Sequence, residues 1–216
     1  MTIERQPEPD LMNGEEQALA YAQADFSDPH ENFIELFKQS FPGQTIDGDV
    51  LDLGCGPGDI IIRFAKHFPD SHMLAVDGAD AMLALGQKAI EAAGLTNNIT
   101  LQKAYLPTDA IAEKNYQAII SNSLLHHLPD PAVLWRTVKT FAKPGGRIFI
   151  MDLKRPKSAA EAAFLRDTYA KDEPELLQRD FYNSLLAAFE PEEIEAQLQE
   201  AGLSNLSVRG VSDRHL

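Results

Sequence analysis

Short apolar runs alternate with longer amphipathic segments from about residue 48 to residue 153. The apolar runs are continuous and too short for helices, which is typical of strands buried on both faces of a sheet. The segments between them follow the spacing of helices packed on a sheet. Strands alternating with helices predict a parallel sheet covered on both faces, a three-layer α/β fold. The expected strands are 50–53, 72–76, 99–102, 117–121 and 147–153, and the expected helices are 60–68, 79–93 and 130–143, with a weak helical segment between the third and fourth strands.

Two helical segments lie outside this alternation. Residues 13–41 precede the first strand, and residues 158–189 follow the fifth with one or two helices rich in alanine and leucine. An amphipathic helix is then expected at 191–201, capped by Gly202, and a last strand at 206–211. The expected organisation is a single domain over 1–216, with N-terminal helices at 13–41, a core at 48–153, a helical insertion at 158–189 and a C-terminal helix and strand within 191–216.

The chain is strongly acidic, with a formal net charge of -14 and a pI of about 4.7 over 216 residues. Such a charge repels nucleic-acid phosphates and anionic membrane surfaces. The longest basic cluster is only Lys154, Arg155 and Lys157. No apolar stretch has the length of a membrane helix, and the polar first ten residues do not resemble a secretory signal. We expect a cytoplasmic protein, monomeric or homodimeric, without nucleic-acid or membrane partners.

A glycine-rich turn directly follows the first expected strand. After Asp52, glycines stand at Gly54, Gly56 and Gly58, where the chain passes from strand to helix. Glycine lets the backbone turn sharply and approach a ligand closely. The dinucleotide pattern Gly-x-Gly-x-x-Gly needs a glycine one position later, where this chain has Asp59, whose charge opposes a pyrophosphate at the helix N-terminus. The alternative is a purely structural strand-to-helix turn.

This turn resembles motif I of the class I S-adenosylmethionine-dependent methyltransferases, an acidic residue followed by a spacer and Gly-x-Gly-x-Gly. The cofactor of that family has no phosphate, which agrees with Asp59. The resemblance implies a Rossmann-like, doubly wound, mostly parallel sheet and an enzyme that uses S-adenosylmethionine and releases S-adenosylhomocysteine. It also implies that the added helices at 13–41 and 158–189 form a lid. The cofactor-binding residues implied in the turn are Asp52, Gly54, Cys55, Gly56 and Gly58.

Further cofactor contacts follow from the same resemblance. Asp77 ends the second expected strand, where a carboxylate suits a ribose diol, although it could instead cap the next helix. Gly78 and Met82 would lie near the adenosine. In the third-strand region the acid found in many family members is absent, so adenine contacts there would come from the backbone or from Tyr105. After the fourth strand, Asn122 and Ser123 would border the methionine portion of the cofactor.

The acceptor side is less specific in the sequence. The segment around His126 and His127 resembles that of family members acting on small molecules, and it lacks the Asn/Asp-Pro-Pro-aromatic motif of base and protein-amide methyltransferases. We therefore expect a small-molecule acceptor. Either histidine could serve as a general base, or both could be structural. Residues that could grip substrate or cofactor from the lid, or simply pack, are Tyr21, Asp25, Phe26, Tyr169, Tyr182 and Asn183.

Four smaller expectations concern metal binding, Cys55, the C-terminus and Arg155. We expect no metal site, because adjacent histidines should point in different directions and no matched ligands stand nearby in the sequence. Cys55 is expected to pack within the glycine turn. The chain ends at Leu216, where the last hairpin of the family's sheet should turn, so we expect the exposed strand edge to be compensated in another way. Arg155 is expected to be a solvated surface charge, with contact to an anionic substrate as the alternative.

Other functions predict different behaviour. A nicotinamide-dependent oxidoreductase would bind NAD, which Asp59 and the glycine spacing disfavour. A non-catalytic module on the same fold would bind the cofactor without turnover. RNA methylation conflicts with the acidic composition. The scaffold does not fix whether oxygen, nitrogen, sulfur or carbon accepts the methyl group.

Overall fold

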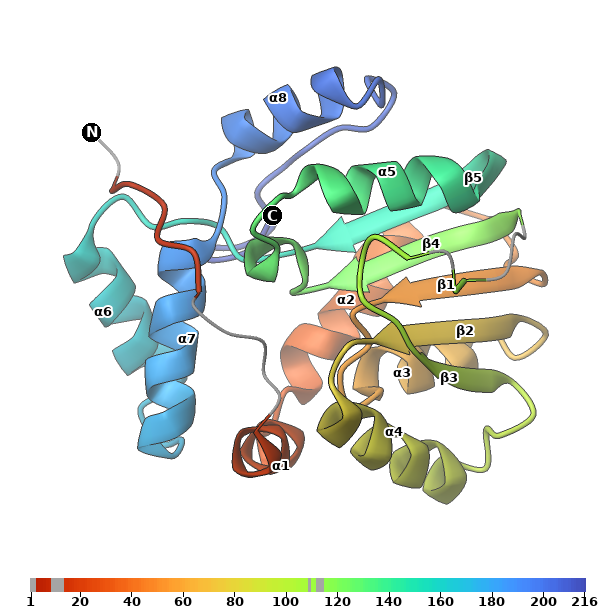
Figure 1. The fold of residues 1–216 in the computed structure, drawn as a ribbon, viewed down its shortest axis with the longest axis horizontal. Coiled ribbons are helices and arrows are strands. Elements are labelled where there is room, and N and C mark those ends of the chain that lie inside the picture. The colour runs from red at the N-terminus through yellow and green to blue at the C-terminus, as the bar shows by residue number, and fades with distance from the viewer. Residues whose placement is uncertain (1–2, 9–13, 109, 112–114) are drawn as a thin grey trace. The chain divides into compact units, whose positions relative to one another are not determined.

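The computed structural model describes residues 3–8, 14–108, 110–111 and 115–216. The chain forms two compact units (Figure 1). The sheet unit comprises residues 12–122 and 137–150, and the terminal unit comprises residues 1–11, 123–136 and 151–216. The two units share one connecting helix, α5 (Ala132–Phe141), which begins in the terminal unit and ends in the sheet unit.

A five-stranded sheet forms the centre of the sheet unit, in the order β3-β2-β1-β4-β5. The strands pair in parallel wherever a register is defined; Leu51, for example, lies opposite Leu74 on one side and Ile119 on the other. Because the strand order reverses between β1 and β4, their carboxyl ends flank the switch point at which α/β sheets bind ligands. The strands are β1 (Asp49–Leu53), β2 (His72–Asp77), β3 (Ile99–Lys103), β4 (Tyr116–Asn122) and β5 (Ala142–Met151).

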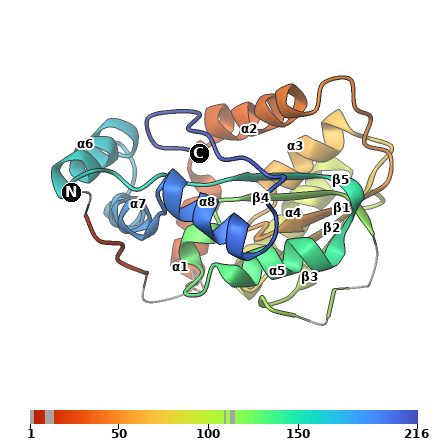
Figure 2. The ribbon, with the colours of Figure 1, turned by 90° about the horizontal axis from the view of Figure 1, so that it is seen from above.

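Helices cover both faces of this sheet, which confirms the predicted three-layer α/β fold. Helices α2 and α3 lie on one side and the C-terminal half of α5 on the other (Figure 2). Phe37 of α2 fixes this packing through edge contacts with Phe64 and Phe149, at ring-centroid distances of 4.9 and 5.8 Å. The helices preceding α5 are α1 (Glu15–Gln23), α2 (Ser27–Ser40), α3 (Asp59–His67) and α4 (Asp80–Ala93).

The terminal unit is mainly helical. It contains a short 3₁₀ turn, η1 (Leu125–His127), and helices α6 (Ala159–Tyr169), α7 (Glu175–Ala187) and α8 (Pro191–Glu200). The N-terminal segment 3–8 packs on this unit: the Arg5 side chain donates to the carbonyl oxygen of Ala187 at 2.6 Å, and Gln6 N–H donates to Leu186. A small apolar core holds the helices together, made of Leu153, Ala162, Leu165, Leu185, Leu186 and Ala188.

Two predicted elements are wrong. Residues 206–211 form no strand, and the described part of 104–115 contains no helix. The last residues pair with the chain after β5 instead: Asp152 and Leu216 exchange two backbone hydrogen bonds of 3.0 Å, and Lys154 N–H donates to Arg214. This antiparallel pairing gives hydrogen-bond partners to backbone groups of residues 152–154, just after β5. The sequence led us to expect compensation of this kind. In the described part of the chain, no helix is both long and apolar enough to cross a bilayer.

Candidate functional site

The glycine loop, Gly54–Gly58, needs glycine for its backbone conformation. Gly54, Gly56 and Gly58 have φ values of +73°, +52° and +87°, in the left-handed region that side chains disfavour. The loop is tied to the next strand, because Gly54 and Cys55 N–H both donate to the carbonyl oxygen of Val76. A Cβ added to Gly56 would meet nothing within 4 Å, so the loop leaves open space there. Close approach of a ligand to the backbone is therefore possible.

Asp77, at the end of β2, links the loop to helix α4. One carboxylate oxygen accepts the Gly56 N–H and the other accepts the Ala79 N–H, both at 2.8 Å. The Ala79 bond is a cap-like contact at the start of α4, so the capping role of Asp77 finds support, and its ribose contact stays a prediction. A carboxylate oxygen has two acceptor positions, so each oxygen retains one for a ligand donor. This pair of acceptors beside the open space suits two neighbouring hydroxyl groups.

Asp52 stands on β1, two residues before the loop, and is buried. Its side chain is only 1% exposed, and one of its oxygens has no hydrogen-bond partner among the described residues. Burial, with a further contribution from the charge of Asp77, raises the pKa of Asp52 to about 8. Cys55 is also buried, and burial raises the pKa of its thiol well above its usual range. Packing, not thiolate chemistry, is therefore the role that the structure supports for Cys55.

Asn122 ends β4, beside β1 at the switch point. Its side-chain carbonyl oxygen is buried and has no partner among the described residues. The next residue, Ser123, has a φ of +57°, and its N–H donates to Met151 at 2.9 Å. A non-glycine residue in this conformation is strained, and such strain gathers at functional sites. The unpartnered oxygens of Asp52 and Asn122 and the spare acceptors of Asp77 fit a cofactor with hydroxyl and ammonium donors.

The start of α3 differs from a pyrophosphate site. Asp59 is its first residue, and its carboxylate is held by His30 Nδ1 at 2.6 Å and by Arg63 Nε at 2.9 Å. Burial opposes ionisation, but these two partners hold the pKa of Asp59 below its usual range. A fixed negative charge therefore occupies the helix N-terminus, where a dinucleotide phosphate would need positive potential.

Other predicted contacts in the sheet unit differ in their placement. Met82 is buried against Ala18 of α1, and Gly78 precedes it, half-buried, at the start of α4. Tyr105 is 51% exposed, with the ammonium of Lys103 5.8 Å from the centre of its ring. No described contact connects Tyr105 to the glycine loop, so its adenine contact stays a prediction.

Helix α1 places the side chain of Tyr21 near the charges of Asp59 and Asp77. Burial, aided by the charges of Asp59 and Asp77, raises the pKa of Tyr21 to about 12. Phe26 packs on Tyr21 with a centroid distance of 4.7 Å, so these two lid candidates lie together. Asp25 does not join them; its carboxylate accepts from the backbone N–H and hydroxyl of Ser27 and so caps the start of α2.

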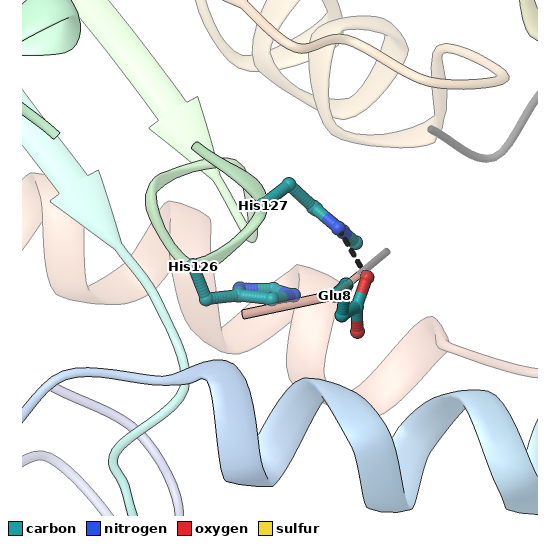
Figure 3. A group of neighbouring side chains, drawn as sticks. All are labelled: Glu8, His126 and His127. Carbon is teal, nitrogen blue, oxygen red and sulfur yellow. Dashed lines mark ion pairs between the residues drawn. The ribbon is translucent and has the colours of Figure 1, made fainter. Parts of the chain in front are cut away.

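The two histidines gather in the terminal unit with two acidic residues. His126 Nδ1 lies 2.5 Å from Asp152, whose second oxygen accepts the Leu125 N–H. His127 Nδ1 lies 2.6 Å from Glu8, and Figure 3 shows this pair beside the His126 ring. The imidazole centroids are 4.0 Å apart. The expectations that these rings diverge and that no matched ligand lies near them are therefore wrong.

The two histidines differ in their exposure to solvent. His126 is 2% exposed, and its Nε2 has no partner in the described part of the chain. Burial alone would lower the pKa of His126, but the charge and hydrogen bond of Asp152 outweigh it and raise the pKa. Burial likewise opposes ionisation of Asp152, yet His126 holds the pKa of that carboxyl below its usual range. His127 keeps a partly exposed side chain.

The remaining lid candidates make mainly structural contacts. The Tyr169 hydroxyl donates to Asp213 at 2.6 Å, and Arg214 lies over its ring. Tyr182 packs against the apolar core of the terminal unit, and Asn183 follows it on α7, half-buried. Their substrate roles stay predictions. Arg155 is not a solvated charge: it is 6% exposed and donates to Glu193 at 2.7 Å and to the Ala188 carbonyl oxygen.

Sequence reasoning missed Asp152 and Glu8. Asp152 had a signal, because it directly follows the apolar run 148–151 and is itself an acid. Such a residue requires a partner. Glu8 had no such signal, because it belongs to a polar N-terminal segment without the hydrophobic periodicity of a helix or strand.

Comparison with known proteins supports the geometry of the sheet unit. A family model described as "Methyltransferase domain" matches residues 50–146. A "Ubiquinone biosynthesis O-methyltransferase" of Bordetella bronchiseptica is 29% identical over 180 residues, covering 80% of this chain and 69% of the relative. A protein of the same name from Acinetobacter baumannii is 30% identical over 113 residues. In that match the chain spans about half of the relative, 46% of its length.

Solved structures share the fold at low sequence identity. A SAM dependent methyltransferase from Aquifex aeolicus superimposes with a TM-score of 0.64 at 18% identity, covering 88% of both chains. The plantazolicin methyltransferase BpumL in complex with SAH gives a TM-score of 0.62 at 16% identity, covering 85% of this chain and 63% of BpumL. The [4+2]-cyclase SpnF shares the fold with a TM-score of 0.55 at 14% identity over 73% of this chain and 53% of SpnF. The fold alone therefore does not fix the reaction.

Proposed function

We propose that this chain, whose residues 50–146 match a methyltransferase family model, is a class I S-adenosylmethionine-dependent methyltransferase that transfers a methyl group to a hydroxyl oxygen of a small molecule. The observation that carries the proposal is the Asp77 carboxylate, which ties the glycine loop to β2 and keeps acceptor positions beside an open space. An oxygen acceptor is supported by relatives whose names describe O-methyltransferases of ubiquinone biosynthesis.

The residues of the sheet unit would bind and orient the donor. Asp77 would accept hydrogen bonds from the two ribose hydroxyls, as a charged acceptor does most strongly. The side-chain oxygens of Asn122 and Asp52, which lack partners among the described residues, would accept from the ammonium group of the methionine portion. S-adenosylmethionine, when bound, supplies a methyl group on a positively charged sulfur. The protein accelerates its transfer mainly by holding the acceptor at attack distance.

The loop itself provides a matched pair of substitutions. Gly56→Ala and Gly94→Ala both place a methyl group on a residue with positive φ, +52° and +70°, and neither new Cβ meets anything within 4 Å. Both substitutions should lower the free energy of unfolding by a similar amount, roughly 1 kcal/mol. Only Gly56 faces the proposed cofactor space, because Gly94 caps the far end of α4.

We expect Gly56→Ala to weaken S-adenosylhomocysteine binding about tenfold or more in calorimetric titration, a loss of about 1.4 kcal/mol. Equal affinities for the two variants would contradict this placement.

Activity is tested with S-adenosylmethionine carrying a labelled methyl group and a panel of phenols, catechols, amines and thiols. We expect label on the oxygen of a phenol or catechol, with one S-adenosylhomocysteine released per methyl group. Label on nitrogen or sulfur only would overturn the oxygen acceptor. Tight binding of S-adenosylhomocysteine without labelling of any acceptor would favour a non-catalytic cofactor-binding module.

A further inference from the structure

We infer that Glu8, His126 and His127 form a binding site for one divalent transition-metal cation of the Zn²⁺ class. One ligand atom from each residue lies within 4.8 Å of the other two. The three side chains converge from η1 and the N-terminal segment (Figure 3). Ligands of a tetrahedral zinc ion lie about 3.4 Å apart, so small side-chain movements would close the site. This inference does not depend on the proposed methyl transfer.

The Nε2 atom of His126 points to a ligand independently of this proximity. It is buried and has no hydrogen-bond partner among the described residues, although a buried unsatisfied polar atom costs about 1–3 kcal/mol. The opposite ring nitrogen is held by Asp152 at 2.5 Å. A carboxylate on one imidazole nitrogen with the other nitrogen left available is the usual arrangement of metal-binding histidines, because it fixes the ring and strengthens its donor atom.

Glu8 is held in position by two contacts. Its two oxygens contact different partners, the Ser184 hydroxyl and His127 Nδ1, both at 2.6 Å. A cation would share its surroundings with Arg5, which donates to the backbone carbonyl oxygens of His126 and Leu128. The carboxylates of Glu8 and Asp152 offset that positive charge.

The donor set selects among metals. Two imidazole nitrogens and one carboxylate suit Zn²⁺, Co²⁺ or Fe²⁺, whereas Mg²⁺ and Ca²⁺ prefer oxygen ligands. Three protein ligands leave at least one coordination position open, as in catalytic zinc sites. The two histidines would then act as metal ligands and not as the general bases that the sequence led us to consider. The expectation of no metal site would also be wrong.

The test is calorimetric titration of the tag-free, chelator-treated full chain with ZnCl₂, with the visible absorption of added Co²⁺ as a second readout. We compare Glu8→Gln and His127→Gln, both partly exposed, with His67→Gln as the control. His67 lies 3.2 Å from Glu31 in the sheet unit, so the control removes a similar histidine–carboxylate pair elsewhere. Folding of each variant is checked by circular dichroism.

We expect the chain to bind one Zn²⁺ ion, and we expect millimolar Mg²⁺ to leave this binding unchanged. Glu8→Gln and His127→Gln should each weaken binding at least about tenfold, since even residues that only support ligands change affinity by 10–100-fold. His67→Gln should bind as the unaltered chain does. No Zn²⁺ binding by the unaltered chain would overturn the inference. So would full affinity in both Glu8→Gln and His127→Gln, or an equal loss in His67→Gln.

Discussion

Replacing Asp77 by asparagine is expected to weaken S-adenosylhomocysteine binding by about 100-fold or more. The substitution keeps the size of the side chain but replaces one acceptor oxygen with an NH₂ donor. Asp77 accepts from Gly56 N–H and from Ala79 N–H, so the NH₂ group must face one of these donors. The ribose would also lose charged acceptors, and a hydrogen bond to a charged group contributes about 1.5–3 kcal/mol. Two such bonds correspond to at least about 100-fold in affinity.

The matched control is Asp80→Asn. Asp80 lies three residues further along the chain and is exposed, paired only with Lys103 in the described structure. The Asp80→Asn substitution therefore removes one negative charge from the same region and leaves the contacts of the glycine loop unchanged. We expect Asp80→Asn to bind S-adenosylhomocysteine like the unaltered chain in calorimetric titration. Unaltered affinity in Asp77→Asn, or an equal loss in Asp80→Asn, would refute the assigned role of Asp77.

Asp52→Asn is expected to stabilise the protein, by an amount that grows with pH. Burial and then the charge of Asp77 raise the pKa of Asp52 to about 8, whereas the carboxyl of an unfolded chain ionises near pH 3.9. Between these two pH values the folded state holds a proton that the unfolded state has lost. Folding stability therefore falls as pH rises, by up to about 1.4 kcal/mol per pH unit. Asparagine has no such proton to lose.

The measurement is the free energy of unfolding by urea at pH 5 and pH 8. The advantage of Asp52→Asn over the unaltered chain should increase by as much as about 4 kcal/mol between these conditions. The comparison isolates one group, because every other titrating residue is common to both chains. Asp49→Asn, at the half-buried start of the same strand, is the comparison variant, and the gain of Asp52→Asn should exceed that of Asp49→Asn. An advantage that is the same at both pH values would show that Asp52 is ionised throughout.

The glycine loop and the sheet were predictable because their signals are local. Gly54, Gly56 and Gly58 stand where left-handed backbone is needed, and β2 contains a continuous apolar run, residues 73–76. Asp77 was found from its position after the second strand. Parallel pairing then brings the ends of neighbouring strands to the same edge of the sheet, so the residues of the candidate cofactor site come together from short sequence patterns.

The cluster around the histidines depends on contacts between distant parts of the chain. His126 contacts Asp152, which is 26 positions away in the sequence. His127 contacts Glu8, which lies near the N-terminus. The directions of the two histidines were also misjudged. In an extended strand neighbouring side chains point to opposite faces, but η1 is a 3₁₀ turn with about three residues per turn. Adjacent side chains there diverge less, and the two rings lie close together.

The wrong C-terminal strand has a related cause. Residues 206–211 carry the alternation of a strand, but a strand also needs a partner, which sequence does not show. Arg214 and Leu216 instead pair with Lys154 and Asp152, and residues 206–211 form only the connection to them.

The most direct test of the central claim is calorimetric titration of the full chain with S-adenosylhomocysteine, with NAD titrated in parallel. We predict a single site of micromolar affinity for S-adenosylhomocysteine and no binding of NAD, because Asp59 fixes a negative charge where a pyrophosphate would lie. Binding of NAD without binding of S-adenosylhomocysteine would contradict the assignment of the glycine loop and Asp77 to a methyl donor.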